Sequence, residues 1–116
     1  MPENYAAMEK GCELFRRIFA KPVYLLIINY LARTYWYSHR RHSRFHEEIE
    51  EDVCKNPGVD KEQINWNVFE FLSQSGWIKR IYPKQAGGLI AYEITEQGNQ
   101  LAVFLRNEEI LKLFRP

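Results

Sequence analysis

The sequence predicts a mostly helical α+β fold in a single domain that spans residues 1–116. Apolar side chains recur every three or four residues over several long segments, which indicates amphipathic helices. One pair of short β-type segments, 77–82 and 89–94, flanks a link that contains proline and glycine, which indicates a β-hairpin. The length of 116 residues and the hydrophobic content of 46% suit one domain with its own core.

The first two predicted helices cover residues 5–20 and 22–36. The first carries an apolar stripe at helical spacing, formed by Tyr5, Met8, Cys12, Phe15 and Phe19. The second opens with Pro22, a residue favoured in the first turn of a helix. Because the second helix is apolar nearly all round, we expect it at the buried centre of the fold.

A third helix is predicted over residues 44–55, with Ser43 as its N-cap and the polar segment 38–44 as a connector before it. The tripeptide Asn56-Pro57-Gly58 is a strong stop signal. The third helix therefore ends before this turn.

A fourth helix is predicted over residues 61–75. Asp60 caps its start, and Gln63 completes a pattern similar to a capping box. Gly76 suits the left-handed position that follows a helix. The third and fourth helices thus form a helix-turn-helix over about residues 43–76.

The hairpin, residues 77–94, leads into a last helix over residues 95–114 that Thr95 caps. A lone hairpin is marginal in water, so it must pack on helices. A helical pair followed by a small basic hairpin and another helix is the layout of a winged helix. The predicted fold is therefore a winged helix-turn-helix with extra N- and C-terminal helices.

Candidate DNA contacts lie on the fourth helix and on the hairpin. The helix offers Lys61, Asn65 and Asn67, residue types that contact base edges or phosphates. Residues 60–76 nevertheless hold three acids and one lysine, so base reading and an ordinary solvated face both stay open. The hairpin is the better electrostatic candidate, because residues 77–92 contain no acid and three basic residues: Lys79, Arg80 and Lys84.

Charge is also segregated before the turn. Residues 33–46 hold four arginines and no acid, whereas residues 47–52 hold five acids. Arg40 and Arg41 are candidate phosphate contacts. The basic block can equally pair with its acidic neighbour, for example Arg44 with Glu48 at i,i+4.

No sequence feature indicates catalysis, a metal or a cofactor. His39, His42 and His46 are spaced three and four apart, but they lie in an arginine-rich segment that opposes cation binding. Nucleotide-binding and nucleophile motifs are absent from the sequence, so we expect no enzyme. The two cysteines lack ligand spacing, no secretory leader is evident, and the longest apolar run, 23–32, is too short for a membrane span, so we expect a cytoplasmic protein.

The terminal helices carry more apolar surface than a small core needs, which indicates a homodimer interface. The candidate interface residues are Tyr5, Met8, Phe15, Phe19, Leu101, Phe104 and Leu105. The alternative is that both helices wrap their own domain.

Residues 44–105 resemble the MarR/HxlR/PadR-like winged-helix transcription regulators. The resemblance rests on Gly76-Trp77-Ile78-Lys79-Arg80 at the end of the fourth helix and on Tyr92-Glu93-Ile94-Thr95 with Gly98 at the exit from the hairpin. It implies a DNA-binding homodimer whose terminal helices form the interface.

The sequence therefore predicts a dimeric regulator of transcription that binds double-stranded DNA, in a sequence-dependent or an architectural way. The rival interpretation is a winged-helix protein-interaction module. That module would meet a protein partner through the acidic segment 47–52 and through Trp66.

Overall fold

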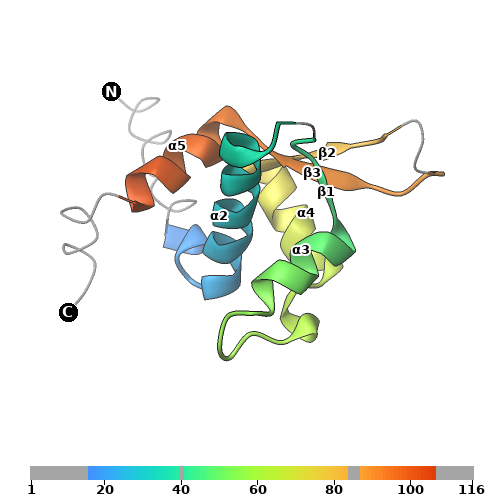
Figure 1. Ribbon diagram of the computed structural model, residues 1–116. Coiled ribbons are helices and arrows are strands. Elements are labelled where there is room, and N and C mark those ends of the chain that lie inside the picture. Colours follow the sequence, from blue (N-terminus) through green and yellow to red (C-terminus); the bar gives the residue numbers. More distant parts are fainter. Residues whose placement is uncertain (1–15, 40, 84–86, 107–116) are drawn as a thin grey trace, which may run out of the picture.

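The computed structural model describes residues 16–39, 41–83 and 87–106. The fold is α+β and mostly helical, with one three-stranded antiparallel sheet (Figure 1). Its elements in chain order are α2 (Pro22–Tyr37), β1 (Arg44–Phe45), α3 (His46–Val53), the short 3-10 helix η1 (Lys61–Gln63), α4 (Trp66–Gln74), β2 (Ile78–Ile81), β3 (Ala91–Ile94) and α5 (Glu96–Leu105).

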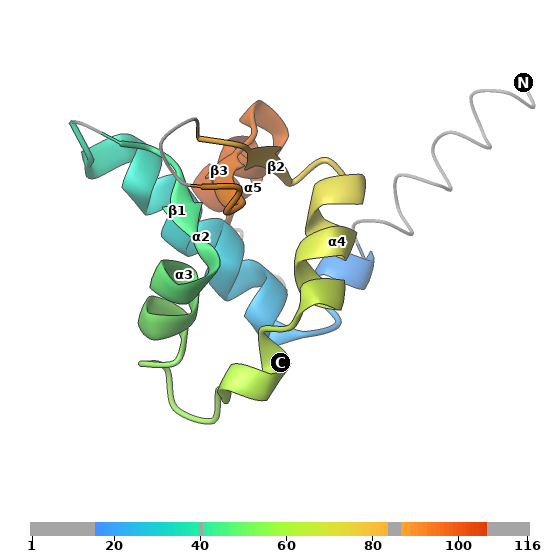
Figure 2. The same cartoon turned by 90° about the vertical axis from the view of Figure 1, so that its right-hand side faces the viewer.

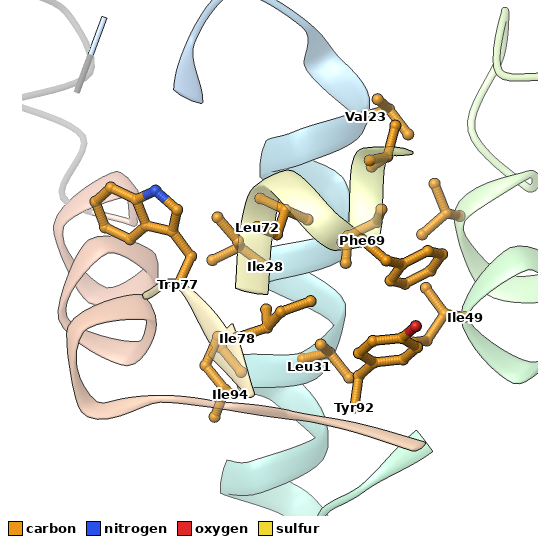
Figure 3. Close-up of a cluster of buried hydrophobic side chains, with 14 of the residues drawn as sticks. Val23, Ile28, Leu31, Ile49, Phe69, Leu72, Trp77, Ile78, Tyr92 and Ile94 are labelled. Atoms are coloured by element: carbon orange, nitrogen blue, oxygen red, sulfur yellow. The ribbon is translucent and has the colours of Figure 1, made fainter. Parts of the chain in front are cut away.

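Helix α2 forms the centre of the core, as predicted. Its residues Ile27, Ile28 and Leu31 are fully buried, and α3, α5 and β3 pack around it. Figure 3 shows the ring of Tyr92 from β3 lying against Phe69 from α4, with the ring centroids 4.4 Å apart. This contact joins the sheet to α4.

Strand β1 was not predicted. Arg44 pairs with Tyr92 and Phe45 with Ala91, which gives the sheet order β1–β3–β2. The prediction that Ser43 caps a helix starting at Arg44 is therefore wrong. Because Phe45 is still extended, α3 begins only at His46, and the side chain of Glu48 accepts a hydrogen bond from the Phe45 N–H at 3.0 Å.

The predicted fourth helix is interrupted. Gln63 Oε1 accepts from the Asp60 N–H at 3.1 Å, as the capping pattern indicated, but this pair opens only η1. Ile64 leaves the helical conformation with φ −105° and ψ 63° and is 1% exposed. Burial of this side chain coincides with the break, and Asn65 then caps a separate helix, α4.

Gly76 ends α4 as predicted, with a left-handed φ of 83°. The N–H groups of Trp77 and Gly76 donate to the carbonyls of Leu72 (3.0 Å) and Ser73 (3.2 Å), which is a Schellman motif. This motif turns the chain from α4 directly into β2. The start of the hairpin is thus fixed relative to α4.

The base of the hairpin is tied to α5. Thr95 caps α5 as predicted, since its Oγ1 accepts from the Gly98 N–H at 3.0 Å. The same hydroxyl lies 2.6 Å from the Gly76 carbonyl, to which it can donate. Gly98 also lies against the Trp77 carbonyl, where a Cβ would come within 2.1 Å of the oxygen. From this base the two strands extend beyond the helices (Figure 1).

Two predicted segments lie partly outside the described residues. Of the first helix, 5–20, the structure describes only the end, where residues 16–18 are helical. Of the last helix, residues 107–114 are not described. Within the described ranges, no helix is both long and apolar enough to cross a membrane.

Candidate nucleic-acid interface

The α4 helix and the hairpin meet at a corner formed by Trp66 and Arg80. Residues two apart in a strand share a face, so Arg80 lies on the same face of β2 as the buried Ile78, toward the helices. The Arg80 guanidinium carbon lies 5.0 Å from the ring centroid of Trp66, at the first residue of α4. Trp66 remains 49% exposed, so the corner is open to solvent.

Arg80 has no acidic partner among the residues that the structure describes. Its Nε is buried and makes no hydrogen bond there. Tyr92, directly across on β3, is a buried phenol. Burial raises the pKa of Tyr92, and the Arg80 guanidinium opposes this rise. Arg80 is therefore a half-buried cation that lies over the Trp66 ring and forms no ion pair with a described acid.

Lys79 points to the other face of the hairpin and is paired. It lies opposite Glu93 in the register, with Nζ 3.7 Å from a carboxylate oxygen. This acid lies just beyond the hairpin segment that the sequence showed to be free of acids. The third basic residue of the predicted hairpin site, Lys84, lies outside the described residues.

Two of the predicted contacts on the helix side are engaged within the molecule. Lys61 Nζ lies 3.7 Å from a carboxylate oxygen of Glu50 on α3. Asn65 is the N-cap of α4: its Oδ1 accepts from the Val68 N–H at 3.2 Å. Its Nδ2 donates to the Glu62 carbonyl at 3.1 Å. Asn65 therefore fixes the start of α4, and both the oxygen and the nitrogen of its side-chain amide form hydrogen bonds with neighbouring backbone groups.

The solvent face of α4 is polar and carries no basic residue. Asn67 is exposed there, and Glu70 and Gln74 are joined by a hydrogen bond of 3.2 Å. Asn67 also lines a hollow of about 630 Å³ between the starts of α2 and α4. Of the three predicted helix residues, Asn67 alone has a side chain that forms no hydrogen bond or ion pair with another described residue.

The basic segment before α3 pairs with the acidic helix, which was one of the two interpretations of the sequence. Arg41 forms an ion pair with Glu48, and Arg33 forms one with Asp52. The suggested pairing of Arg44 with Glu48 is wrong. Because Arg44 lies in β1, it instead donates to the carbonyls of Arg41 (2.8 Å) and Ser43 (3.0 Å). Arg40 lies outside the described residues.

The histidines do not gather at one point. The His42 ring lies against Tyr35 and the His46 ring against Phe69, with His46 Nε2 3.0 Å from a carboxylate oxygen of Glu50. In the described part of the chain, no group of three or more histidine, cysteine, aspartate or glutamate residues is placed to hold a metal ion.

The predicted dimer residues that are described belong mainly to the monomer core. Leu101 is 5% exposed, and Phe19, Phe104 and Leu105 are partly buried against the core. The outward apolar residue of α5 is instead Val103, which is 55% exposed. Tyr5, Met8 and Phe15 lie outside the described residues.

The Trp66–Arg80 contact is the feature of the site that sequence reasoning missed. It depends on the break at Ile64, which starts α4 at Trp66, and on the hairpin alignment that turns Arg80 inward. The alignment has no local sequence signal. The break has one, because Asn65 is a residue type favoured at the N-cap. Comparison with known proteins adds no further residues, since no protein-family model and no curated protein matches the chain.

Proposed function

We propose that this chain is a winged-helix regulator of transcription that binds double-stranded DNA as a homodimer and grips the phosphate backbone with its hairpin. The order α2, β1, α3, α4, β2, β3 supports the winged-helix assignment. So does the sheet order β1–β3–β2, in which a short strand before the helical pair completes the sheet of the wing. In this assignment α4 is the recognition helix and β2–β3 is the wing.

The observation that carries the proposal is that Arg80 forms no ion pair with a described acid. A guanidinium matches the geometry of a phosphate, and Arg80 has no carboxylate partner among the described residues to neutralise it. It stands at the corner between the proposed recognition helix and the wing, on a hairpin that extends from the body of the molecule (Figure 1). A DNA backbone that follows this corner would pass beside the Arg80 guanidinium.

Titration of the protein against a labelled random-sequence duplex, followed by fluorescence anisotropy at several salt concentrations, tests the proposal. We expect a dissociation constant of about 1–100 μM at physiological salt and tighter binding at low salt, because each phosphate contact releases condensed counterions. Absence of binding at low salt by a folded protein would contradict the proposal. Sedimentation equilibrium of the same sample tests the homodimer.

A second candidate, a protein-interaction module, is favoured by the exposed apolar side chains of the hairpin. Tyr82 is 66% exposed and Leu89 is 63% exposed, and both lie beside the strands of the hairpin. Tryptophan, tyrosine and arginine are the residue types that dominate protein interfaces. A chain that is folded and binds no duplex at low salt would favour this second function.

A further inference from the structure

We propose that Trp66 is a positioning residue for Arg80, so that the two side chains act as one unit in phosphate binding. This inference rests on the proposed DNA-binding function and assigns a role to a side chain that base reading does not require. The two residues come from different elements, the first turn of α4 and the middle of β2. Their contact is thus a property of the folded molecule.

The geometry supports one orientation of the guanidinium. Its carbon lies 5.0 Å from the centroid of the Trp66 ring, within the range of a cation–π interaction. The Nε of Arg80 is buried and has no hydrogen-bond partner among the described residues, which leaves the terminal Nη groups as the donors that a phosphate can reach. An arginine held in this way loses less conformational freedom when it binds than one that is free in solvent.

Trp66 is itself fixed by the backbone. The break at Ile64 and the cap at Asn65, with its two hydrogen bonds, place Trp66 as the first residue of α4. About half of the Trp66 side chain is nevertheless exposed, so core packing alone does not explain a residue of this size there. Holding the Arg80 guanidinium in place accounts for both its position and its exposure.

A double-mutant cycle tests the coupling. Trp66→Leu, Arg80→Ala and the double variant are titrated with one duplex at one salt concentration, and each dissociation constant is compared with that of the wild type. We expect Trp66→Leu to weaken binding about fourfold in the wild-type background and to have almost no effect in the Arg80→Ala background. Trp66→Phe, which keeps an aromatic face, should restore most of the affinity.

Arg80→Lys, alone and combined with Trp66→Leu, and one NMR measurement separate the explanations. Arg80→Lys keeps the charge but loses the planar group, so Trp66→Leu should have a smaller effect in that background than in the wild type. In the free protein, the NMR resonance of the Arg80 Nε–H should show a ring-current shift that disappears in Trp66→Leu. Thermal unfolding of each variant checks that the fold is retained.

The outcomes are distinguishable. An equal loss from Trp66→Leu in the wild-type and Arg80→Ala backgrounds would mean that Trp66 contacts DNA by itself, which overturns the positioning role alone. Unchanged affinity in Trp66→Leu also overturns that role. A wild-type chain that binds no duplex overturns the proposed function and this inference together, and the NMR shift then reports only whether the contact exists.

Discussion

The two sides of the candidate interface differ in how their positive charges are used. On the helix side, residues 41–74, which include α3, η1 and α4, the basic groups Arg41 and Lys61 each lie within ion-pair distance of an acid of α3. On the hairpin side, Lys79 is paired with Glu93, but Arg80 meets no acid among the described residues. Figure 2 shows α3 and α4 on either side of α2, with the hairpin above them.

The difference teaches that the number of basic residues in a segment does not measure its ability to bind a phosphate. An exposed ion pair contributes only about 0.2–1 kcal/mol, so a phosphate can displace it. The displaced carboxylate remains nearby, however, and repels the incoming backbone. Among the described residues Arg80 has no such competitor. The hairpin side is therefore expected to dominate DNA affinity, although residues 41–74 hold four basic residues and residues 77–94 hold three.

The largest expected effect comes from detaching the base of the hairpin. In Gly98→Ala the new methyl group would lie 2.1 Å from the Trp77 carbonyl oxygen, a backbone atom that cannot easily move. We expect a loss of about 3 kcal/mol in the free energy of unfolding, measured by urea denaturation.

The matched control is Gly58→Ala on the helix side. Gly58 has a φ of +80°, but an added Cβ would have no neighbour within 4 Å. That change should cost only the left-handed strain of about 1–2 kcal/mol. Equal losses in the two variants would show that the hairpin base is no more tightly packed than an open turn.

The next effect concerns the two described basic residues of the hairpin. Arg80→Ala should weaken duplex binding about tenfold, which corresponds to about 1.4 kcal/mol. Lys79→Ala should weaken it about threefold, because Lys79 already shares its charge with Glu93. Anisotropy titrations at one salt concentration measure both. A larger loss in Lys79→Ala than in Arg80→Ala would contradict the importance of the corner.

A smaller effect, in the direction of tighter binding, is expected from Glu93→Gln. This change removes the acid beside Lys79 and leaves the lysine available to a phosphate. We expect an affinity increase of about threefold at low salt that fades as salt rises. Glu51→Gln removes the same charge from the exposed face of α3 and should have less effect. If both variants gain equally, only the net charge of the protein matters.

The smallest effect is a dependence of stability on pH at the corner. Burial raises the pKa of Tyr92 above its ordinary value of 10.0, so the folded state holds this proton more tightly than the unfolded state does. The resulting stabilisation is fully present below the ordinary pKa of 10.0 and is lost as the pH rises through the raised pKa of the folded state. The free energy of unfolding of the wild type should therefore fall more steeply in this range than that of Tyr92→Phe. Parallel curves would contradict the assignment.

Much of the fold could be predicted from the sequence because its signals are local. Pro22 marked the start of α2, Gly76 marked the end of α4, and Thr95 marked the cap of α5. Strand β1 could not be predicted, since two residues become a strand only when the edge of β3 lies beside them. The break at Ile64 was missed for a similar reason, because it accompanies burial in the core.

The candidate site was less predictable than the fold. The residue types and the positive hairpin were evident in the sequence, but the partners of each charge come from other elements. Lys61 meets Glu50 across the turn, and nothing near Lys61 in the sequence predicts that contact. Asn65 carried a cap signal of its own, but Asp60, five residues earlier, offered another one that Gln63 completed.

The most direct test compares two double variants that remove the same charge from the two sides. Lys79→Ala with Arg80→Ala alters the hairpin side, and Arg41→Ala with Lys61→Ala alters the helix side. The measurement is the slope of log affinity against log salt for a random duplex. We predict that the hairpin pair lowers the magnitude of the slope by about 1–2 and the helix pair by less than about 0.5. Equal reductions, or a larger one for the helix pair, would contradict the claim that the hairpin grips the backbone.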